Sequence, residues 1–105
     1  MLDLFRRKPA RADAPPAPDA RYRHAAQVTS TREAGRTVLL DHRGGAYFGL
    51  DEVGTRVWDL LGGGASLASA VDVLADEYDA PRNVLEHDVA EIVSRLVKSN
   101  LLEAA

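Results

Sequence analysis

Three short runs in the first half of the chain have the hydrophobic and polar patterns of β-strands. Residues 26–31 alternate along their whole length, which predicts a half-buried β-strand. Residues 37–41 and 46–50 are rich in β-branched and aromatic side chains, which favour strands. Glycines in both intervening segments mark turns. Turns this short predict that the three strands form an antiparallel meander.

After residue 50 the apolar residues recur every three to four positions, which predicts three helices. Asp51 and Ser66 are suited to cap the first two helices, because their side chains accept hydrogen bonds from free backbone N–H groups. Three consecutive glycines at positions 62–64 end the first helix, and Pro81 starts the third. Asn100 can adopt the left-handed conformation that ends a helix, so the two leucines after it can fold back onto the third helix.

The order of the predicted elements assigns the fold class. All strands come before all helices, so the fold is α+β and not a succession of βαβ units. We predict a winged helix-turn-helix-like domain in which a three-stranded antiparallel sheet is followed by three helices, and we assign it to residues 24–105. Residues 1–23 are rich in Pro and Ala and are expected to form a flexible N-terminal tail.

The tail begins with three apolar residues followed by three cations, within Met1–Lys8. This arrangement could form a short docking or membrane-touching motif, or it could be a solvated start of the chain. The solvated start is the favoured interpretation.

Charge is unevenly distributed along the 105 residues. The formal net charge is -3, but residues 1–23 carry six Lys/Arg and three Asp/Glu, whereas the remainder carries seven Lys/Arg and thirteen Asp/Glu. An acidic body disfavours nucleic acid as a partner, because nucleic-acid affinity depends on neutralising phosphates. No apolar run is long enough for a membrane helix, and the N-terminus lacks the apolar centre of a secretory signal. We therefore expect a cytoplasmic protein that binds neither nucleic acid nor membrane.

Residue types that carry chemistry do not form a catalytic pattern. The chain has no Cys, which excludes thiolate nucleophiles and cysteine-ligated zinc. His24, His42 and His87 lack the spacing of a metal motif and are interpreted as surface or capping residues. No serine lies in a Gly-x-Ser-x-Gly sequence, and the glycines at 62–64 lack the Gly-Lys-Ser/Thr of a phosphate-binding loop. We predict no catalytic residues, no metal, no cofactor and no enzymatic activity.

A winged-helix-like fold raises DNA binding through the third helix as an alternative. The first turns of that helix carry Glu86, Asp88 and Glu91, which would face the phosphates with the wrong sign. DNA binding is therefore disfavoured.

The third predicted strand, residues 46–50, is short and is expected at the sheet edge. An edge strand exposes N–H and C=O groups with which another chain can pair. If the third helix packs beside this edge, its apolar residues form one wall of a groove: Leu85, Val89, Ile92 and Leu96. A fully buried helix face is an equally good interpretation of the same residues. A second copy of the chain could also pair with the edge to form a homodimer.

Three runs carry a family resemblance: Val-Leu-Leu-Asp at 38–41, Gly-Ala-Tyr-Phe-Gly-Leu-Asp at 45–51 and Gly-Thr-Arg-Val-Trp-Asp-Leu-Leu at 54–61. Together they resemble the PqqD-type family, whose pattern is a strand, a glycine turn, a Tyr-Phe strand, an Asn or Asp cap and a Gly-x-x-Val-Trp-x-Leu-Leu helix. Residues 74–79 resemble the end of the family's second helix, and residues 88–102 resemble its third helix and terminal leucines. The resemblance extends from about residue 26 to residue 103.

Members of this family are RiPP recognition elements, which bind the leader region of a ribosomally made precursor peptide. The resemblance implies a non-catalytic domain that takes up the leader as an added strand on the third strand, against the third helix. By position it implies these leader-binding residues: Ala46, Tyr47, Phe48, Gly49, Leu50, Leu85, Asp88, Val89, Ile92, Arg95 and Leu96. Helical spacing makes Asp88 and Arg95 the expected polar contacts at the groove rim.

Within the family, the Gly-Thr-Arg-Val-Trp helix and the acidic, stand-alone domain are most similar to the discrete recognition proteins of lasso-peptide pathways. The resemblance then implies a separate leader peptidase or other maturation enzyme as a partner, with a cyclase acting afterwards. A peptide chaperone for a radical-SAM pathway, such as pyrroloquinoline quinone biosynthesis, is the alternative within the family. The long Pro/Ala-rich tail departs from the usual family pattern.

Overall fold

Two small sheets and three helices make up the part of the chain that the structure describes. The computed structural model describes residues 16–105. Its elements are, in chain order, β1 (Tyr22–His24), β2 (Val28–Glu33), β3 (Arg36–Asp41), β4 (Ala46–Leu50), α2 (Glu52–Gly62), α3 (Leu67–Glu77), α4 (Arg82–Lys98) and β5 (Leu102–Ala104). The sheets have the orders β2-β3-β4 and β1-β5, and all pairings in them are antiparallel. The α+β class, with a three-stranded antiparallel sheet followed by three helices, is confirmed.

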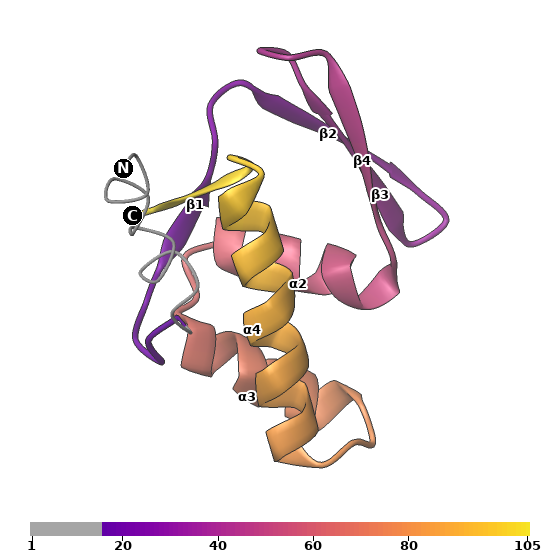
Figure 1. Ribbon diagram of the computed structural model, residues 1–105. Helices are drawn as coiled ribbons and strands as arrows, with labels where there is room; N and C mark the ends of the chain where they lie inside the picture. The colour runs from indigo at the N-terminus through magenta and orange to yellow at the C-terminus, as the bar shows by residue number, and fades with distance from the viewer. Residues whose placement is uncertain (1–15) are drawn as a thin grey trace, which may run out of the picture.

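α2 and α4 lie between the two sheets, and α3 lies farther from the three-stranded sheet (Figure 1). β1 and β5 lie to one side of α4, and the three-stranded sheet lies to the other side. The core forms where the inner face of that sheet meets the helices. Its fully buried side chains include Leu39 from β3, Trp58 and Leu61 from α2, and Val89 and Val93 from α4.

Left-handed backbone positions close both hairpins. Ala34 and Gly35 form the two-residue turn between β2 and β3, with φ of 51° and 78°. Two consecutive positive φ values are typical of a type I′ turn, whose twist matches that of antiparallel strands. Gly45, with φ of 75°, precedes β4. The turns that the glycines predict between the strands are confirmed.

Local capping interactions begin α2 and α3 as predicted. The Asp51 side chain accepts a hydrogen bond from the Gly54 N–H at 2.8 Å, and the Ser66 side chain accepts one from the Ser69 N–H at 3.1 Å. Asn100 follows α4 with φ of 60°. The two leucines after it are 1% and 2% exposed, so the chain folds back onto the core there.

The sequence does not predict β1 or β5. β1 begins at Tyr22, two residues before the predicted start of the folded domain, and it pairs with β5 from Tyr22↔Ala104 to His24↔Leu102. The two strands lie some 80 residues apart in the chain and have three residues each, so neither carries a local signal of its own. After the chain folds back at its C-terminal leucines, it continues as the short strand β5 beside β1.

The chain just before β1 is also attached to the domain. The C=O groups of Pro18 and Ala20 accept hydrogen bonds from the N–H groups of Ala68 and Leu67, at 2.8 and 2.9 Å. These donors belong to the first turn of α3 and have no partner within the helix. Folded backbone thus extends upstream of residue 24. The apolar and basic residues of Met1–Lys8 lie outside the described residues.

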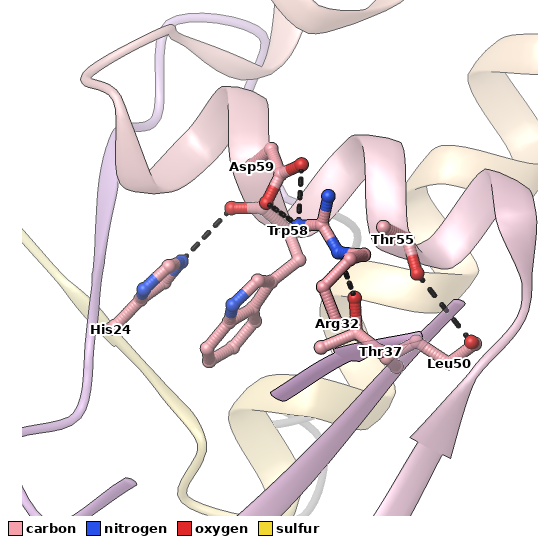
Figure 2. Close-up of polar contacts among 7 residues, drawn as sticks. All are labelled: His24, Arg32, Thr37, Leu50, Thr55, Trp58 and Asp59. Atoms are coloured by element: carbon pink, nitrogen blue, oxygen red, sulfur yellow. Dashed lines mark hydrogen bonds and ion pairs between the residues drawn. The ribbon is translucent and has the colours of Figure 1, made fainter. Parts of the chain in front are cut away.

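β2 begins at Val28, two residues later than predicted, and is exposed along most of its length. Its Arg32 reaches α2, where Nη2 donates to both carboxylate oxygens of Asp59 at 2.7 and 2.8 Å (Figure 2). The Arg32 Nε donates to the Thr37 hydroxyl at 3.1 Å. The predicted half-burial is wrong for most of this strand, because the strand lies at the sheet edge and an ion pair, not an apolar row, covers its inner face.

His24 joins β1 to α2 (Figure 2). Its ring stacks on the Trp58 ring with a centroid distance of 3.6 Å and an interplanar angle of 9°. Its Nε2 lies 2.9 Å from the Trp58 backbone oxygen, which can only accept, so Nε2 is the donor. Trp58 is 2% exposed and belongs to the core. The surface or capping interpretation is wrong for His24, because its ring is half-buried against the core.

Candidate functional site

β4 is an edge strand, as the sequence predicts. Among the described strands it pairs with β3 alone. Phe48 and Leu50 are half-buried and pack against the core, whereas Tyr47 is 71% exposed and Gly49 is exposed. Because side chains alternate along a strand, β4 presents Phe48 and Leu50 to the helices and Tyr47 and Gly49 to the outer face.

One hydrogen bond at the end of the sheet establishes which backbone groups point in which direction. The His42 N–H donates to the Gln27 C=O at 2.9 Å, so the adjacent Val28–Asp41 pair is a non-hydrogen-bonded pair. The pattern alternates along an antiparallel ladder. Asp41 and every second residue before it in β3 therefore turn their backbone groups toward β4. The Gly45 N–H, which donates to the Asp41 C=O at 2.7 Å, agrees with this direction.

The same alternation assigns the backbone of β4. Ala46, Phe48 and Leu50 are opposite the β3 residues whose backbone groups face β4, so their own groups pair within the sheet. Tyr47 and Gly49 therefore turn both the N–H and the C=O outward, away from β3. This edge offers the main-chain donors and acceptors that an added strand requires.

A cleft of about 560 Å³ lies beside this edge, between the second half of β4 and the last turns of α4. Its apolar lining comes from both walls and from the leucine that follows Asn100. Its polar lining combines one carboxylate, two cations and one hydroxyl. The lining residues are Phe48, Gly49, Leu50, Asp51, Gly54, Ile92, Arg95, Leu96, Lys98, Ser99 and Leu101.

The structure brings six of the eleven predicted site residues together at the cleft: Phe48, Gly49, Leu50, Ile92, Arg95 and Leu96. Ala46 and Tyr47 lie on the same edge strand but do not line the cleft. Leu85 and Val89 are 6% and 0% exposed and belong to the core. Asp88 is exposed on α4, also outside the cleft.

The length of α4 explains this division. The helix has 17 residues and packs against α3, and its last turns lie across the cleft from β4. Helical spacing identifies the face that turns inward, but it does not identify which turn lies opposite β4. The buried interpretation therefore holds for Leu85 and Val89, and the groove interpretation fits Ile92.

Sequence reasoning missed five lining residues: Asp51, Gly54, Lys98, Ser99 and Leu101. Lys98 and Ser99 follow Arg95 by three and four positions, so helical spacing alone could have identified them. Asp51 follows the edge strand directly. Leu101 reaches the cleft because the left-handed Asn100 reverses the chain, and that consequence is visible only in three dimensions.

The described residues offer binding groups and not a metal site. Within residues 16–105, no three His, Asp or Glu side chains are arranged so that they could hold a metal ion. None of the helices in this part of the chain is long and apolar enough to cross a membrane. An open backbone edge beside an apolar cleft suits the binding of an extended peptide.

Comparison with known proteins identifies relatives that span the folded part of the chain. The family model described as Coenzyme PQQ synthesis protein D (PqqD) matches residues 36–102. A structure described as "TbiB1 in Complex with the TbiA(beta) Leader Peptide" is 36% identical with a TM-score of 0.74, and the match covers 77% of this chain and 94% of that chain. A second, "Lasso peptide synthetase B1 complexed with the leader peptide", is 27% identical with a TM-score of 0.75, and the match covers 80% and 99%. No curated protein matches the chain.

The family match contains the site. Residues 36–102 run from the start of β3 to the start of β5, so they include β4, α4 and every residue that lines the cleft. The resemblance carried by the Tyr-Phe strand and the Val-Trp helix is thereby confirmed. The chain belongs to the PqqD family of RiPP recognition elements.

Proposed function

We propose that this chain binds the leader segment of a ribosomally synthesised precursor peptide in a lasso-peptide pathway. The leader adds to β4 as a further strand, and its inward side chains enter the cleft beside α4. The chain then presents the bound leader to a separate leader peptidase, after which a cyclase acts. Its own contribution is binding, without a catalytic group.

The observation that carries this proposal is the position of the cleft directly beside the outward backbone groups of β4. The N–H and C=O groups of Tyr47 and Gly49 supply main-chain hydrogen bonds, and the cleft supplies selectivity for side chains. Both similar structures are described as complexes with a leader peptide. One of them is described as a lasso peptide synthetase B1, which favours the lasso pathway over the radical-SAM alternative.

An added strand presents its side chains alternately to the two faces of the sheet. The peptide residue opposite Phe48 points to the inner face and therefore toward the cleft. Phe48 and Ile92 are half-buried, so an apolar peptide side chain can remove their remaining surface from water. Leu85 and Val89 support α4 from the core, and Asp88 lies two turns before Arg95, where a longer leader would meet it.

Fluorescence polarisation tests the proposal directly. Labelled leader peptides from precursor genes adjacent to this one are titrated with the full chain and with Tyr47→Pro. Proline removes an outward N–H and sterically opposes pairing at that edge, while the bonds between β3 and β4 remain. We expect saturable binding to the wild-type chain and a loss of about tenfold or more in Tyr47→Pro.

Three variants complete the design. Ser30→Pro places proline at an outward position of the opposite edge strand, β2, and should leave affinity unchanged. Tyr47→Ala removes the exposed ring but keeps the N–H, and should retain strand pairing. Phe48→Pro removes a bond inside the sheet and serves only as a folding reference, followed by circular dichroism. Equal binding by the wild-type chain and a folded Tyr47→Pro variant would refute strand addition on β4.

The presentation step has its own assay. Cleavage of the full precursor by the leader peptidase is followed with and without this chain. We expect the wild-type chain to accelerate cleavage and Tyr47→Pro to lose that effect. If the wild-type chain and Tyr47→Pro accelerate cleavage equally, the acceleration does not depend on leader binding. That result would contradict presentation.

A further inference from the structure

The cleft gathers positive charge in a domain that is otherwise acidic. Residues 24–105 carry seven Lys/Arg and thirteen Asp/Glu, yet both charged cleft residues on α4, Arg95 and Lys98, are basic. Asp51 is the acid among the residues that line the cleft. Its Oδ1 accepts a hydrogen bond from the Gly54 N–H at 2.8 Å, at the positive N-terminus of α2, which partly compensates its charge.

Arg95 differs from the arginines that hold the fold together. Arg32, Arg56 and Arg82 each contact a carboxylate, with N–O distances of 2.7, 2.6 and 2.6 Å. Arg95 is exposed, and its side chain makes no hydrogen bond or ion pair with any residue between 16 and 105. Its planar guanidinium is therefore available to a bound carboxylate, to which it can donate two parallel hydrogen bonds.

The geometry of an added strand relates this cation to the peptide. Peptide residues opposite Phe48 and Leu50 both face the cleft and are two positions apart. Ile92 and Leu96 provide an apolar wall on α4, and Arg95 lies between them in the sequence of that wall. Two cleft-facing side chains of the peptide would therefore meet a cleft that offers both an apolar surface and a cation.

On the basis of the function proposed above, we propose that Arg95 selects leader segments in which an apolar residue and an Asp or Glu lie two positions apart and both face the cleft. The carboxylate pairs with the Arg95 guanidinium while the apolar side chain covers Phe48 and Ile92. A purely structural role is the alternative for this residue, because a cation in the last turn of α4 also stabilises the helix dipole. That role acts whether or not a peptide is bound.

A charge-swap titration distinguishes selection from helix stabilisation. Each Asp or Glu of the labelled leader that binds the wild-type chain is changed in turn to its amide and to Lys. These peptides are titrated against the wild-type chain, Arg95→Glu and Arg95→Gln. Arg43→Glu is the matched control, because it makes the same change in net charge at an exposed loop residue outside the cleft.

We expect one acidic position whose amide form binds the wild-type chain about fivefold more weakly. Arg95→Glu should weaken the acidic peptide about tenfold, leave the amide peptide within about twofold, and bind the Lys peptide more tightly than the wild-type chain does. Arg43→Glu should change none of these affinities by more than about twofold.

Two results would overturn the selection by Arg95. In the first, Arg95→Glu loses affinity equally for the acidic and the amide peptides, which indicates a structural role. In the second, Arg95→Glu loses no affinity for the acidic peptide. Arg95→Gln, which keeps the helix and removes the charge, repeats the test if Arg95→Glu unfolds. If the wild-type chain binds the leader and Tyr47→Pro does not, either result refutes selection by Arg95 but leaves the proposed function supported. If no leader binds the wild-type chain, both fall together.

Discussion

Replacing Gly62 by Ala should destabilise this domain, although alanine ordinarily favours a helix over glycine. Gly62 is the last residue of α2 and packs against the ring of His24. A Cβ at this position would overlap the His24 Nε2 and would lie 2.5 Å from its Cε1. The His24 ring must therefore leave its place on Trp58.

The size of the effect follows from the contacts that the ring makes. Displacing it removes a stacked aromatic contact, worth about 0.5–1.5 kcal/mol, and the hydrogen bond to the Trp58 backbone oxygen, worth about 0.5–1.5 kcal/mol. The lower backbone entropy of alanine in the unfolded chain offsets about 0.4–1 kcal/mol. We expect Gly62→Ala to lower the free energy of unfolding by about 1 kcal/mol.

A double-mutant cycle in urea isolates this contact. His24→Ala removes the ring that obstructs the new Cβ, so Gly62→Ala in that background should be neutral or stabilising. The coupling energy between the two positions should therefore be about 1 kcal/mol or more. If Gly62→Ala stabilises the wild-type chain as much as it stabilises His24→Ala, the ring does not constrain position 62 and the reasoning is refuted.

Two further predictions concern a helix cap and an ion pair. Asp51→Ala should lower the free energy of unfolding by about 1 kcal/mol, because the Gly54 N–H loses its acceptor, whereas Asp51→Asn should keep most of it; urea denaturation of both variants checks this. The Arg56 guanidinium, by hydrogen bonding, holds the pKa of Glu77 below its ordinary value of 4.5. Because the folded pKa is the lower one, the pair stabilises the fold fully above pH 4.5 and loses its effect as the pH falls through the folded pKa. Glu77→Gln should therefore flatten the fall in stability below pH 4.5, measured by urea unfolding at several pH values; an unchanged profile would contradict the role of this pair.

Features that depend on a few neighbouring residues could be predicted from the sequence. A cap such as Asp51 or Ser66 needs only its own side chain and an N–H three residues later. The left-handed Asn100 likewise depends on local backbone energetics. These positions divide the chain into its three helices, and the shortness of residues 46–50 favours a place at the sheet edge for that strand. The sheet and helix order could therefore be predicted.

Features that depend on distant parts of the chain could not be predicted from the sequence. β1 exists only because β5 returns beside it, and the stack of His24 on Trp58 joins segments 34 residues apart. The same limit applies to the site. Periodicity identifies the inward face of α4, but the choice between Val89 in the core and Ile92 at the cleft depends on where α4 passes β4.

The two edges of the three-stranded sheet are not equivalent, and the difference bears on self-association. At β2, Arg32 points its charge inward to Asp59, and a charge in that position disfavours pairing with another strand. At β4, the outward groups of Tyr47 and Gly49 lie beside the cleft. A homodimer paired through β4 would occupy the same backbone groups as a leader peptide, so the two states exclude each other. By mass action, any such dimer lowers the apparent leader affinity in proportion to the monomer that it removes. Weak pairing is therefore the form of self-association that is compatible with leader binding at this edge.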